Sequence, residues 1–436
     1  MRKYCLFTGN NAQLYSYTKH GIKSTTAANR ILILLWYNIA HKTITKNIQH
    51  TVQRSGLLLP KLHTASGKTH VQRQRAQTAL QNQGANQPLQ YNNIGTNKTL
   101  FSSINKQSAL EHNMAVKTTC KTTQKMALAC NIVTIVVPVF NRSNLVVETL
   151  DSIACQTALP SLIIVDNNST DNTMSVITEW AQENRKKNFP IKILSEPNQG
   201  AAQARNRGLS EVDTPWTLFF DSDDIMLPCH IQNLVCNIEN NPKANLIGWN
   251  VIVTSLSGKK YIKHFPRKRH IWHNIFNGIM STQQYAATTS LFQKCGGWNP
   301  ELTGWDDYEL GMRLLLCKPS IMYIKSKPAI EVRCQENSIT GTSFRSSPAK
   351  WENSLNSCQT IFQQASMPRY ARYINLKRAV LAAIYKKEGD TANSKRLMAF
   401  SLSNECSSWK KLLLHFAFNY TACGGRGIHW LIAPLI

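Results

Sequence analysis

The sequence predicts an α/β protein built on an open, mostly parallel β-sheet, with helices on both faces and a helical C-terminal region. Short apolar runs alternate with segments of helical periodicity between about residues 130 and 220, which is typical of such a sheet. The first run, residues 132–137, is β-branched throughout, as expected for a strand buried on both faces. Beyond residue 348, apolar residues recur every three to four positions, which predicts helices.

Each element of the first half follows from its local pattern. Strands are expected at residues 132–137, 162–165, 191–194 and 217–220, with helices at 144–155, 171–185 and 199–209 between them. The third helix carries a small-residue face of Ala201, Ala202 and Ala204. Alternation of this kind favours an open α/β sheet over an all-β or all-α fold.

The second half of the chain has a different pattern. Residues 246–254 and 257–265 predict two strands joined by a Ser-Gly turn, ahead of a mixed region. Residues 350–365 and 373–387 place apolar side chains at helical spacing. The final stretch, residues 408–436, is apolar with basic residues between, which fits a terminal helix packed on the core or an interfacial anchor on an anionic membrane surface. No run of 18 apolar residues exists, so no helix spanning a bilayer is expected.

Charge is distributed unevenly along the 436 residues, whose formal net charge is +26. Residues 1–125 contain 17 Lys and Arg but a single acidic residue, Glu111, and they lack apolar periodicity. We expect this segment to be disordered, or to be an extension upstream of a natural start at Met126. A nucleic-acid-binding tail is the alternative, but aromatic residues are not interleaved with the basic ones, so no nucleic-acid partner is expected. The chain is thus divided into residues 1–125, an α/β domain at 126–340 and a helical region at 341–436.

The twelve cysteines are scattered and form no C-x-x-C pair. A chain of this length needs no disulfide staples, and a zinc or thioredoxin-type site would require a spacing that is absent. We therefore expect a reducing, cytoplasmic location, with a peripheral position at the inner face of the plasma membrane if residues 408–436 are an anchor.

Carboxylates are concentrated in FFDSDD, residues 219–224, directly at the end of the fourth predicted strand. In open parallel sheets ligands bind beyond the carboxyl ends of the strands, so the side chains that follow each strand are candidate site residues. Asp221, Asp223 and Asp224 would repel one another without a cation, and oxygen ligands on a loop suit Mg²⁺ or Mn²⁺, which also bind substrate phosphates. A solvated turn or a helix N-cap is the alternative, since Asp is favoured in both.

Five motifs in a fixed order give this cluster a context. They are VVPVFNR (136–142), VDNNSTD (165–171), NQGAAQARNRGL (198–209), FFDSDD (219–224) and CGGWNPELTGWDDYELGMRL (295–314). Together they resemble the motifs of family-2 glycosyltransferases, which are inverting enzymes with the GT-A fold that use nucleotide-diphosphate sugars. Each motif is weak alone, but the ordered set covers about residues 130–340. The resemblance implies that the predicted sheet is a GT-A type nucleotide-binding sheet.

The resemblance also implies roles for individual residues in binding the donor. Asp166, the first aspartate of a VDDGSTD-like motif, would hold the uracil base, while Asn167 replaces the second aspartate and removes a charge. Arg205 would support the nucleotide, and Gly200 would let backbone N–H groups approach phosphate. The full set of implied substrate-binding residues is Pro138, Asn141, Asp166, Asn167, Gly200, Arg205 and Asp221.

Metal binding and proton transfer are assigned by the same resemblance. Asp221 and Asp223 match the family's D-x-D and would bind the metal, with Asp223 the better ligand and Asp224 orienting it. The stretch GWDDYE resembles G-x-E-D-x-D, which makes Asp307 the implied catalytic base and places Asp306 where Glu is commoner. An inverting transfer is a single in-line displacement, so it needs a carboxylate that takes the proton from the acceptor hydroxyl opposite the leaving diphosphate. Alternatively, both aspartates cap a helix that begins at residue 308.

The implied function is a metal-dependent transfer of a sugar from a UDP-sugar to a hydroxyl of a glycan or lipid-linked acceptor, in cell-surface polysaccharide synthesis. Two departures keep alternatives open: Asn167, and Gln335 in the run 333–338, where the family commonly has His. One alternative is a catalytically impaired, basic binding protein. The other is a sugar nucleotidyltransferase, which would want a Gly-rich basic loop after the first strand. The Q-x-x-R-W signature of processive synthases is absent, so a single addition is expected.

Overall fold

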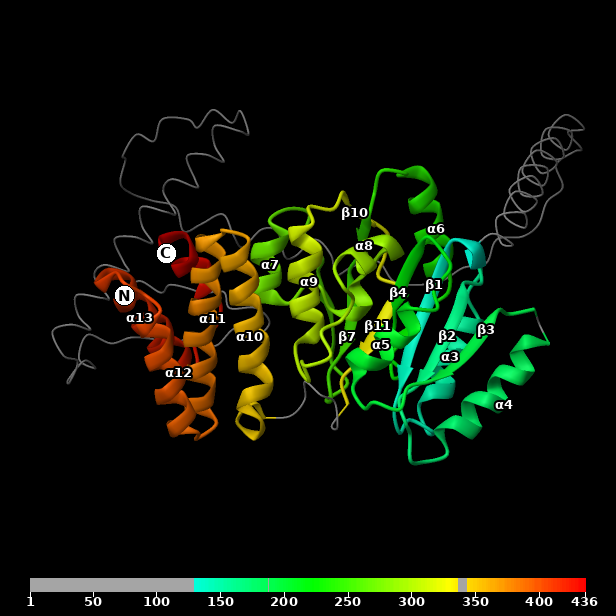
Figure 1. Ribbon diagram of the computed structural model, residues 1–436, viewed down its shortest axis with the longest axis horizontal. Coiled ribbons are helices and arrows are strands. Elements are labelled where there is room, and N and C mark those ends of the chain that lie inside the picture. The colour runs from blue at the N-terminus through cyan, green and yellow to red at the C-terminus, as the bar shows by residue number, and fades with distance from the viewer. Residues whose placement is uncertain (1–128, 187, 336–342) are drawn as a thin grey trace, which may run out of the picture. The chain divides into compact units, whose positions relative to one another are not determined.

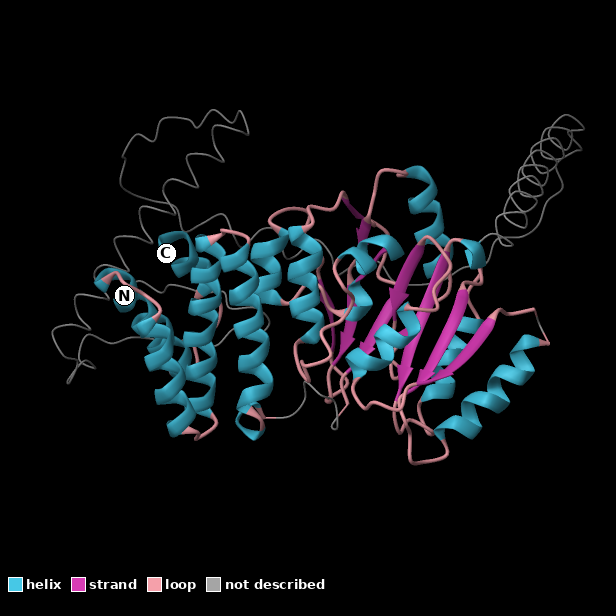
Figure 2. Ribbon diagram, viewed as in Figure 1, coloured by secondary structure: helices cyan, strands magenta, loops and turns pink. Residues whose placement is uncertain are grey.

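The computed structural model describes residues 129–186, 188–335 and 343–436, so the predictions for residues 1–125 lie outside the described residues. A seven-stranded sheet is its largest element of β-structure (Figures 1 and 2). In spatial order the strands are β10 (Ile321–Tyr323), β6 (Leu246–Gly248), β9 (Tyr285–Thr288), β4 (Trp216–Phe219), β1 (Val133–Val139), β2 (Ser161–Asp166) and β3 (Ile191–Ser195). Strand β9 runs antiparallel to β4 and β6, and every other neighbouring pair is parallel. The predicted open, mostly parallel sheet is therefore confirmed.

Both faces of this sheet are covered, because alternate side chains of β1 enter different cores. Val133, Ile135 and Val137 pack in one core with side chains of α3 (Val146–Ala154), α4 (Thr173–Arg185) and α6 (His230–Asn240). Val136 enters the opposite core, with side chains of α5 (Ala201–Leu209) and α8 (Thr289–Lys294). A Cβ at Gly208 would overlap the Val136 side chain, so the small residues of α5 let it approach β1 closely.

A smaller sheet contains, in order, β5 (Ile225–Met226), β11 (Ile330–Arg333), β7 (Val251–Thr254) and β8 (Lys260–Lys263). The single strand predicted at 246–254 is wrong, since its two ends form β6 in the large sheet and β7 in the small one. Trp249 interrupts the run, because its backbone N–H donates to the Gln284 carbonyl (3.0 Å) and its indole N–H to the Gln283 carbonyl (2.8 Å). The expected β7–β8 hairpin is present.

The C-terminal helices pack around a core of their own, which confirms the predicted helical region. They are α10 (Pro348–Gln364), α11 (Pro368–Lys387), α12 (Thr391–Ser403), α13 (Ser408–Ala422) and α14 (His429–Ile432). Proline opens both α10 and α11, at a position where no intrahelical N–H is needed. None of the helices in the described part of the chain has the length and apolar character needed to cross a bilayer.

Helix α9 (Asp306–Leu316) joins this core to the sheet. Its Tyr308 and Met312 pack among the C-terminal helices, together with Ile275 of α7 (His270–Asn277). Leu310 and Leu314, on another side of α9, pack in the core that contains α5. Figure 1 shows α7 and α9 beside α10 and α11. The position of the first turn of α9 therefore depends on both parts of the described chain.

Candidate active site

A cavity of about 1050 Å³ lies at the carboxyl ends of β1, β2 and β4. Its lining also includes residues of α5, the small sheet, the end of α7 with the segment that follows it, the start of α9 and one residue of α11. Of the predicted site residues, the ones that line the cavity are Pro138, Asn141, Asn167, Gly200, Arg205, Asp221, Asp223, Asp306 and Asp307. The structure thus brings together residues that are up to 169 positions apart in the sequence. Only Asp166 among the predicted residues does not line it.

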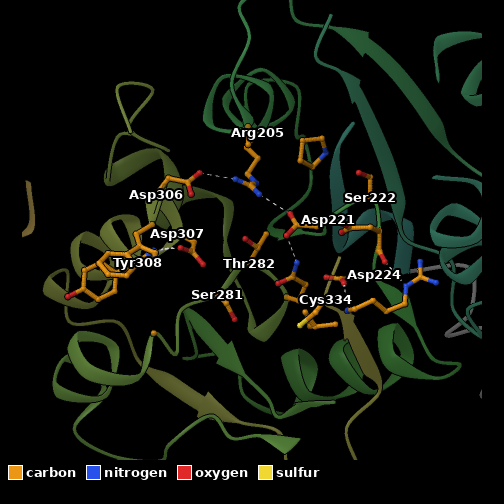
Figure 3. Close-up of a pocket in the computed structure, with 18 of the residues that line it drawn as sticks. Arg205, Asp221, Ser222, Asp224, Ser281, Thr282, Asp306, Asp307, Tyr308 and Cys334 are labelled. Carbon is orange, nitrogen blue, oxygen red and sulfur yellow. Dashed lines mark hydrogen bonds and ion pairs between the residues drawn. The ribbon is translucent and has the colours of Figure 1, made fainter. Parts of the chain in front are cut away.

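Two groups of residues face each other across this cavity, and Figure 3 shows several of them. We call the residues that follow β1, β2 and β4 the strand wall; they are Asn141, Arg142, Asn167 and 221–224. We call the residues gathered around the start of α9 the helix wall; they are Lys263, Trp305, Asp306, Asp307 and Lys377.

The loops of the strand wall are held by amide side chains. Asn141 has a left-handed backbone (φ 49°), which Asn tolerates better than most residues. Its Oδ1 accepts from the Thr170 N–H (2.8 Å), and its own N–H donates to Ser169 Oγ (3.0 Å). The Asn141 side chain therefore fixes the loop after β1 against the loop after β2, in addition to lining the cavity.

Asn167, the departure from the family pattern, is fully engaged by hydrogen bonds. Its Oδ1 accepts from the Gly200 N–H (2.7 Å), and its Nδ2 donates to the carbonyls of Glu196 (3.1 Å) and Asn198 (2.7 Å). An aspartate could not donate to those two carbonyls, which gives Asn167 a structural reason. The Gly200 N–H is consequently occupied, and the phosphate-facing N–H groups expected there are those of the first turn of α5.

Asp166 lies behind the strand wall instead of in it. Its side chain is buried, and its Oδ2 accepts from the Ser169 N–H (3.2 Å). Its Oδ1 is also buried and has no partner in the described part of the chain. The implied contact with uracil therefore stays a prediction.

Arg205 connects the two walls (Figure 3). Its guanidinium donates to Asp221 Oδ1 (2.8 Å) and to Asp306 Oδ2 (2.9 Å), and it lies 4.3 Å from the centroid of the Trp298 ring. Burial alone would lower the pKa of Arg205, but Asp221 and Asp306 outweigh burial and raise it. The residue expected to support the nucleotide is thus a buried bridge between two predicted site carboxylates.

The acidic cluster of the strand wall contains two carboxyl groups with raised pKa values. Burial and the neighbouring Asp221 raise the pKa of Asp223, whose nearest ionic partner is Arg142 at 3.8 Å. Burial, Asp221 and Asp223 raise the pKa of Asp224 well above its usual range. The Asp224 carboxylate accepts from the backbone N–H of Arg333 (2.8 Å), so it holds β11 against the cluster.

Arg333 is a member of the site that its sequence context did not reveal. Its Nε donates to the Asp223 carbonyl (2.6 Å), and its Nη1 donates to Glu148 (2.6 Å). The sequence pattern singled out only the run 333–338 that contains it, and within that run Gln335. Gln335 is not among the residues that line the cavity, and Ser338 lies outside the described residues.

The metal prediction finds partial support in this geometry. Within the described ranges, no three His, Cys, Asp or Glu side chains gather as ligands for an ion. The Asp221 carboxylate accepts hydrogen bonds from Arg205 and from the Gln283 amide, whereas the nearest ionic partner of Asp223 is Arg142 at 3.8 Å. Asp223 is therefore the carboxylate with fewer competing partners for a metal ion. Mg²⁺ and Mn²⁺ bound with substrate phosphates need only one or two protein carboxylates, so Asp223 with Asp221 fits such an ion. Gln283 is a further contact that the sequence pattern did not predict.

The helix wall begins at Trp305, which has a left-handed backbone (φ 51°) before α9. The helix starts at Asp306 and not at residue 308, so both aspartates lie in its first turn, where negative charge is favoured. Asp307 Oδ1 accepts from the Tyr308 N–H (2.7 Å). Burial and the adjacent Asp306 raise the pKa of Asp307 to about 6, against the lowering effect of Lys263. A carboxylate with a pKa near neutrality suits a general base.

The fold is that of the GT-A transferases. It matches the crystal structure of S. aureus TarS, residues 1–349, with a TM-score of 0.53 and 16% sequence identity, over 67% of this chain and 92% of that chain. That structure is described as a complex with UDP-GlcNAc. Likeness at this identity establishes the fold alone.

Sequence comparison finds similarity to glycosyltransferases over the α/β part of the chain. Residues 134–297 match the model of glycosyl transferase family 2. An uncharacterized glycosyltransferase of Haemophilus influenzae is 30% identical over 190 residues, which is 42% of this chain and 62% of the relative. One of Rickettsia felis is 28% identical over 195 residues, which is 42% of this chain and 31% of the relative. The match thus spans less than two thirds of the length of either relative. Residues 134–297 are thus similar to glycosyl transferase family 2, the family that the ordered motifs resemble.

Proposed function

We propose that this protein transfers a sugar from a UDP-sugar to an acceptor hydroxyl with inversion. One observation carries the proposal: a single cavity holds the D-x-D carboxylates on its strand wall and Asp307 on its helix wall. Such a pair of walls gives a donor diphosphate and an attacking hydroxyl separate places. The similarity of residues 134–297 to glycosyl transferase family 2 and the solved complex of TarS with UDP-GlcNAc support a nucleotide-sugar donor.

The residues on each wall suggest how the transfer proceeds. Asp307 accepts the proton of the acceptor hydroxyl as its oxygen attacks the anomeric carbon of the donor sugar. A new carbon–oxygen bond forms there while the bond to the diphosphate breaks, and the electron pair leaves with the UDP. The departing charge would lie near Arg142 of the strand wall and near the first turn of α5, which also lines the cavity.

A divalent ion bound with the donor would be held by Asp223, with Asp221, and would neutralise charge on the diphosphate. Arg205 acts as a positioning residue, because its two ion pairs hold Asp221 and Asp306 in place. Its positive charge also lowers the pKa of Asp307, which favours the unprotonated form that a base requires.

The test is UDP-sugar hydrolysis or transfer with Mn²⁺, comparing wild type with Asp223→Asn and Asp307→Asn. We expect Asp307→Asn to retain donor binding, while its activity falls about 10²–10⁴-fold, since the substitution removes only the proton acceptor. Asp223→Asn is expected to lose metal-dependent donor binding as well. Asp213→Asn, at an exposed position before β4, is the matched control.

Equal activity in wild type and both site variants would overturn the assignment of these two residues. The same assay separates the alternatives. A sugar nucleotidyltransferase would release pyrophosphate from UTP and a sugar phosphate, and an impaired binding protein would bind UDP without turnover.

We further propose that the acceptor is a glycan or lipid-linked saccharide reached from a membrane surface. Helix α13 exposes Trp409, Leu412 and Tyr420 at helical spacing, and Trp430 is exposed just beyond it. Such residues suit the interface of a bilayer. The measurement is sedimentation with anionic vesicles, in which a double variant Trp409→Ser, Leu412→Ser is expected to stay in the supernatant. Equal sedimentation of variant and wild type would contradict this contact.

A further inference from the structure

Two lysines on the helix wall have no acidic partner. Lys263 comes from β8, and its Nζ donates to Ser281 Oγ (3.1 Å). Lys377 comes from α11, and its Nζ donates to the Ile275 carbonyl (2.6 Å). Both partners are neutral. Among the ion pairs of the described residues, none includes Lys263 or Lys377.

The arrangement is electrostatically unfavourable without a further anion. Burial lowers the pKa of Lys263, and burial together with the nearby Lys263 lowers the pKa of Lys377 to about 8. Asp307 is the carboxylate whose charge favours the protonated form of both lysines. Two ammonium groups thus face a single carboxylate, and that carboxylate becomes neutral whenever it holds a proton. Buried charges of one sign are costly unless an opposite charge joins them.

The arginines that line the same cavity are different, because each has a carboxylate partner. Arg142 lies 3.8 Å from Asp223, Arg205 bridges Asp221 and Asp306, and Arg333 binds Glu148. The unmatched positive charge therefore belongs to the helix wall, beside Asp307, and not to the strand wall where the donor diphosphate is placed.

We propose that the acceptor carries an anionic group, phosphate or carboxylate, which binds between Lys263 and Lys377 while its hydroxyl faces Asp307. This inference rests on the proposed function, and it adds the chemical class of the acceptor. Lysine binds phosphate and carboxylate as a compact point charge, which suits a group that has to be held without a fixed orientation. Trp305 lies beside Lys377, whose Nζ is 4.9 Å from its ring centroid, and offers an apolar surface next to the anion.

The experiment is ligand-observed NMR on the full chain saturated with UDP and Mg²⁺, a diamagnetic ion, so that the strand wall is occupied. The probes are sn-glycerol 3-phosphate, glycerate and glycerol, which differ in the anionic group. We expect sn-glycerol 3-phosphate or glycerate to bind at least about tenfold more tightly than glycerol. Binding of the phosphate alone identifies a phosphorylated acceptor, and equal binding of glycerate extends the class to carboxylates.

Matched variants locate the binding. Lys263→Met and Lys377→Met are expected to weaken binding of the anionic probes by at least about tenfold, whereas Lys377→Arg is expected to retain it. Lys259→Met and Lys387→Met change exposed lysines next to β8 and at the end of α11, and they should have no effect.

Equal binding of glycerol and both anions by the wild type would overturn the inference. Anion binding unchanged in both lysine variants would also overturn it, and the wild-type comparison remains decisive if a variant fails to fold. If the protein binds UDP but none of the anions, only this inference is overturned. If it does not bind UDP, the proposed function is overturned.

Discussion

The strand wall and the helix wall of the cavity hold their positive charges in different ways. On the strand wall Arg142 is paired with Asp223, and the amides of Asn141 and Asn167 bind neighbouring loops. On the helix wall the hydrogen bonds of Lys263 and Lys377 go to neutral groups. Paired groups hold the shape of the site, whereas unpaired groups store electrostatic energy that a ligand can release. Variants that treat the two walls differently test this contrast.

The largest effect is expected at Arg205, which holds the walls together. Arg205→Met leaves Asp221 and Asp306 without their buried partner and should lower the free energy of unfolding by about 3–5 kcal/mol. Arg207→Met, in the same helix, breaks a more exposed pair with Glu211 and should lower the free energy of unfolding much less. Urea unfolding measures both, and similar losses in the two variants would mean that burial does not distinguish them.

A smaller loss is expected where the strand wall is braced by an amide. Asn167→Asp restores the residue common in the family but cannot donate to the carbonyls of Glu196 and Asn198. We expect a loss of about 1–3 kcal/mol in urea unfolding, because the buried side chain at this position would no longer donate to either carbonyl. Asn172→Asp, exposed in the same loop, should be neutral. A stable Asn167→Asp variant would show that the loops do not depend on this side chain.

On the helix wall, substitution of Asp307 should increase the free energy of unfolding instead of lowering it. The pKa of Asp307 is about 6 in the folded protein against 3.8 as its ordinary value. Between these pH values Asp307 keeps its proton in the folded state but has lost it in the unfolded state. The free energy of unfolding therefore falls as pH rises through this window, and the full decrease is reached above pH 6. Asp307→Asn should therefore increase the free energy of unfolding near neutral pH by about 1–2 kcal/mol, since solvent in the cavity reduces the full effect. The gain should vanish below pH 3.8. Asp213→Asn should show no gain.

The smallest effect concerns the pH dependence of catalysis. Below pH 6, kcat/KM should fall about tenfold per pH unit, because only unprotonated Asp307 accepts a proton. Asp306 raises this pKa, while Lys263 and Arg205 lower it, and Lys377 is also near. Lys263→Met should move the acid limb to higher pH, and Lys259→Met should not. An unshifted limb would contradict the electrostatic contact between Lys263 and Asp307.

The strand wall could be predicted from the sequence because its residues directly follow apolar runs. Asp221 and Asp223 come immediately behind β4, so knowing the strand is enough to place them. The helix wall could not be predicted in full. Lys263 belongs to β8 of the small sheet and Lys377 to α11, and the packing of α9 and α7 against the C-terminal helices brings Lys377 to Asp307. No local sequence pattern predicts that these lysines lie close to Asp307.

The errors in the fold have a similar origin. Residues 246–254 form one apolar run, and local pattern alone favours one strand. The division into β6 and β7 depends on hydrogen bonds from Trp249 to Gln283 and Gln284, which lie in a distant part of the chain. The ion pairs of Arg205 are equally invisible, since its partners are 16 and 101 positions away.

Helix α9 has a consequence for what counts as a minimal enzyme. The family match ends at residue 297, before α9 begins, and one side of that helix is anchored among the C-terminal helices. A fragment trimmed to the family match would keep the proposed donor site on the strands and lose the proposed proton acceptor. Under the proposed function, the donor site and the acceptor site therefore depend on different parts of the chain, and we expect a change in the C-terminal helices to alter acceptor use more than donor binding.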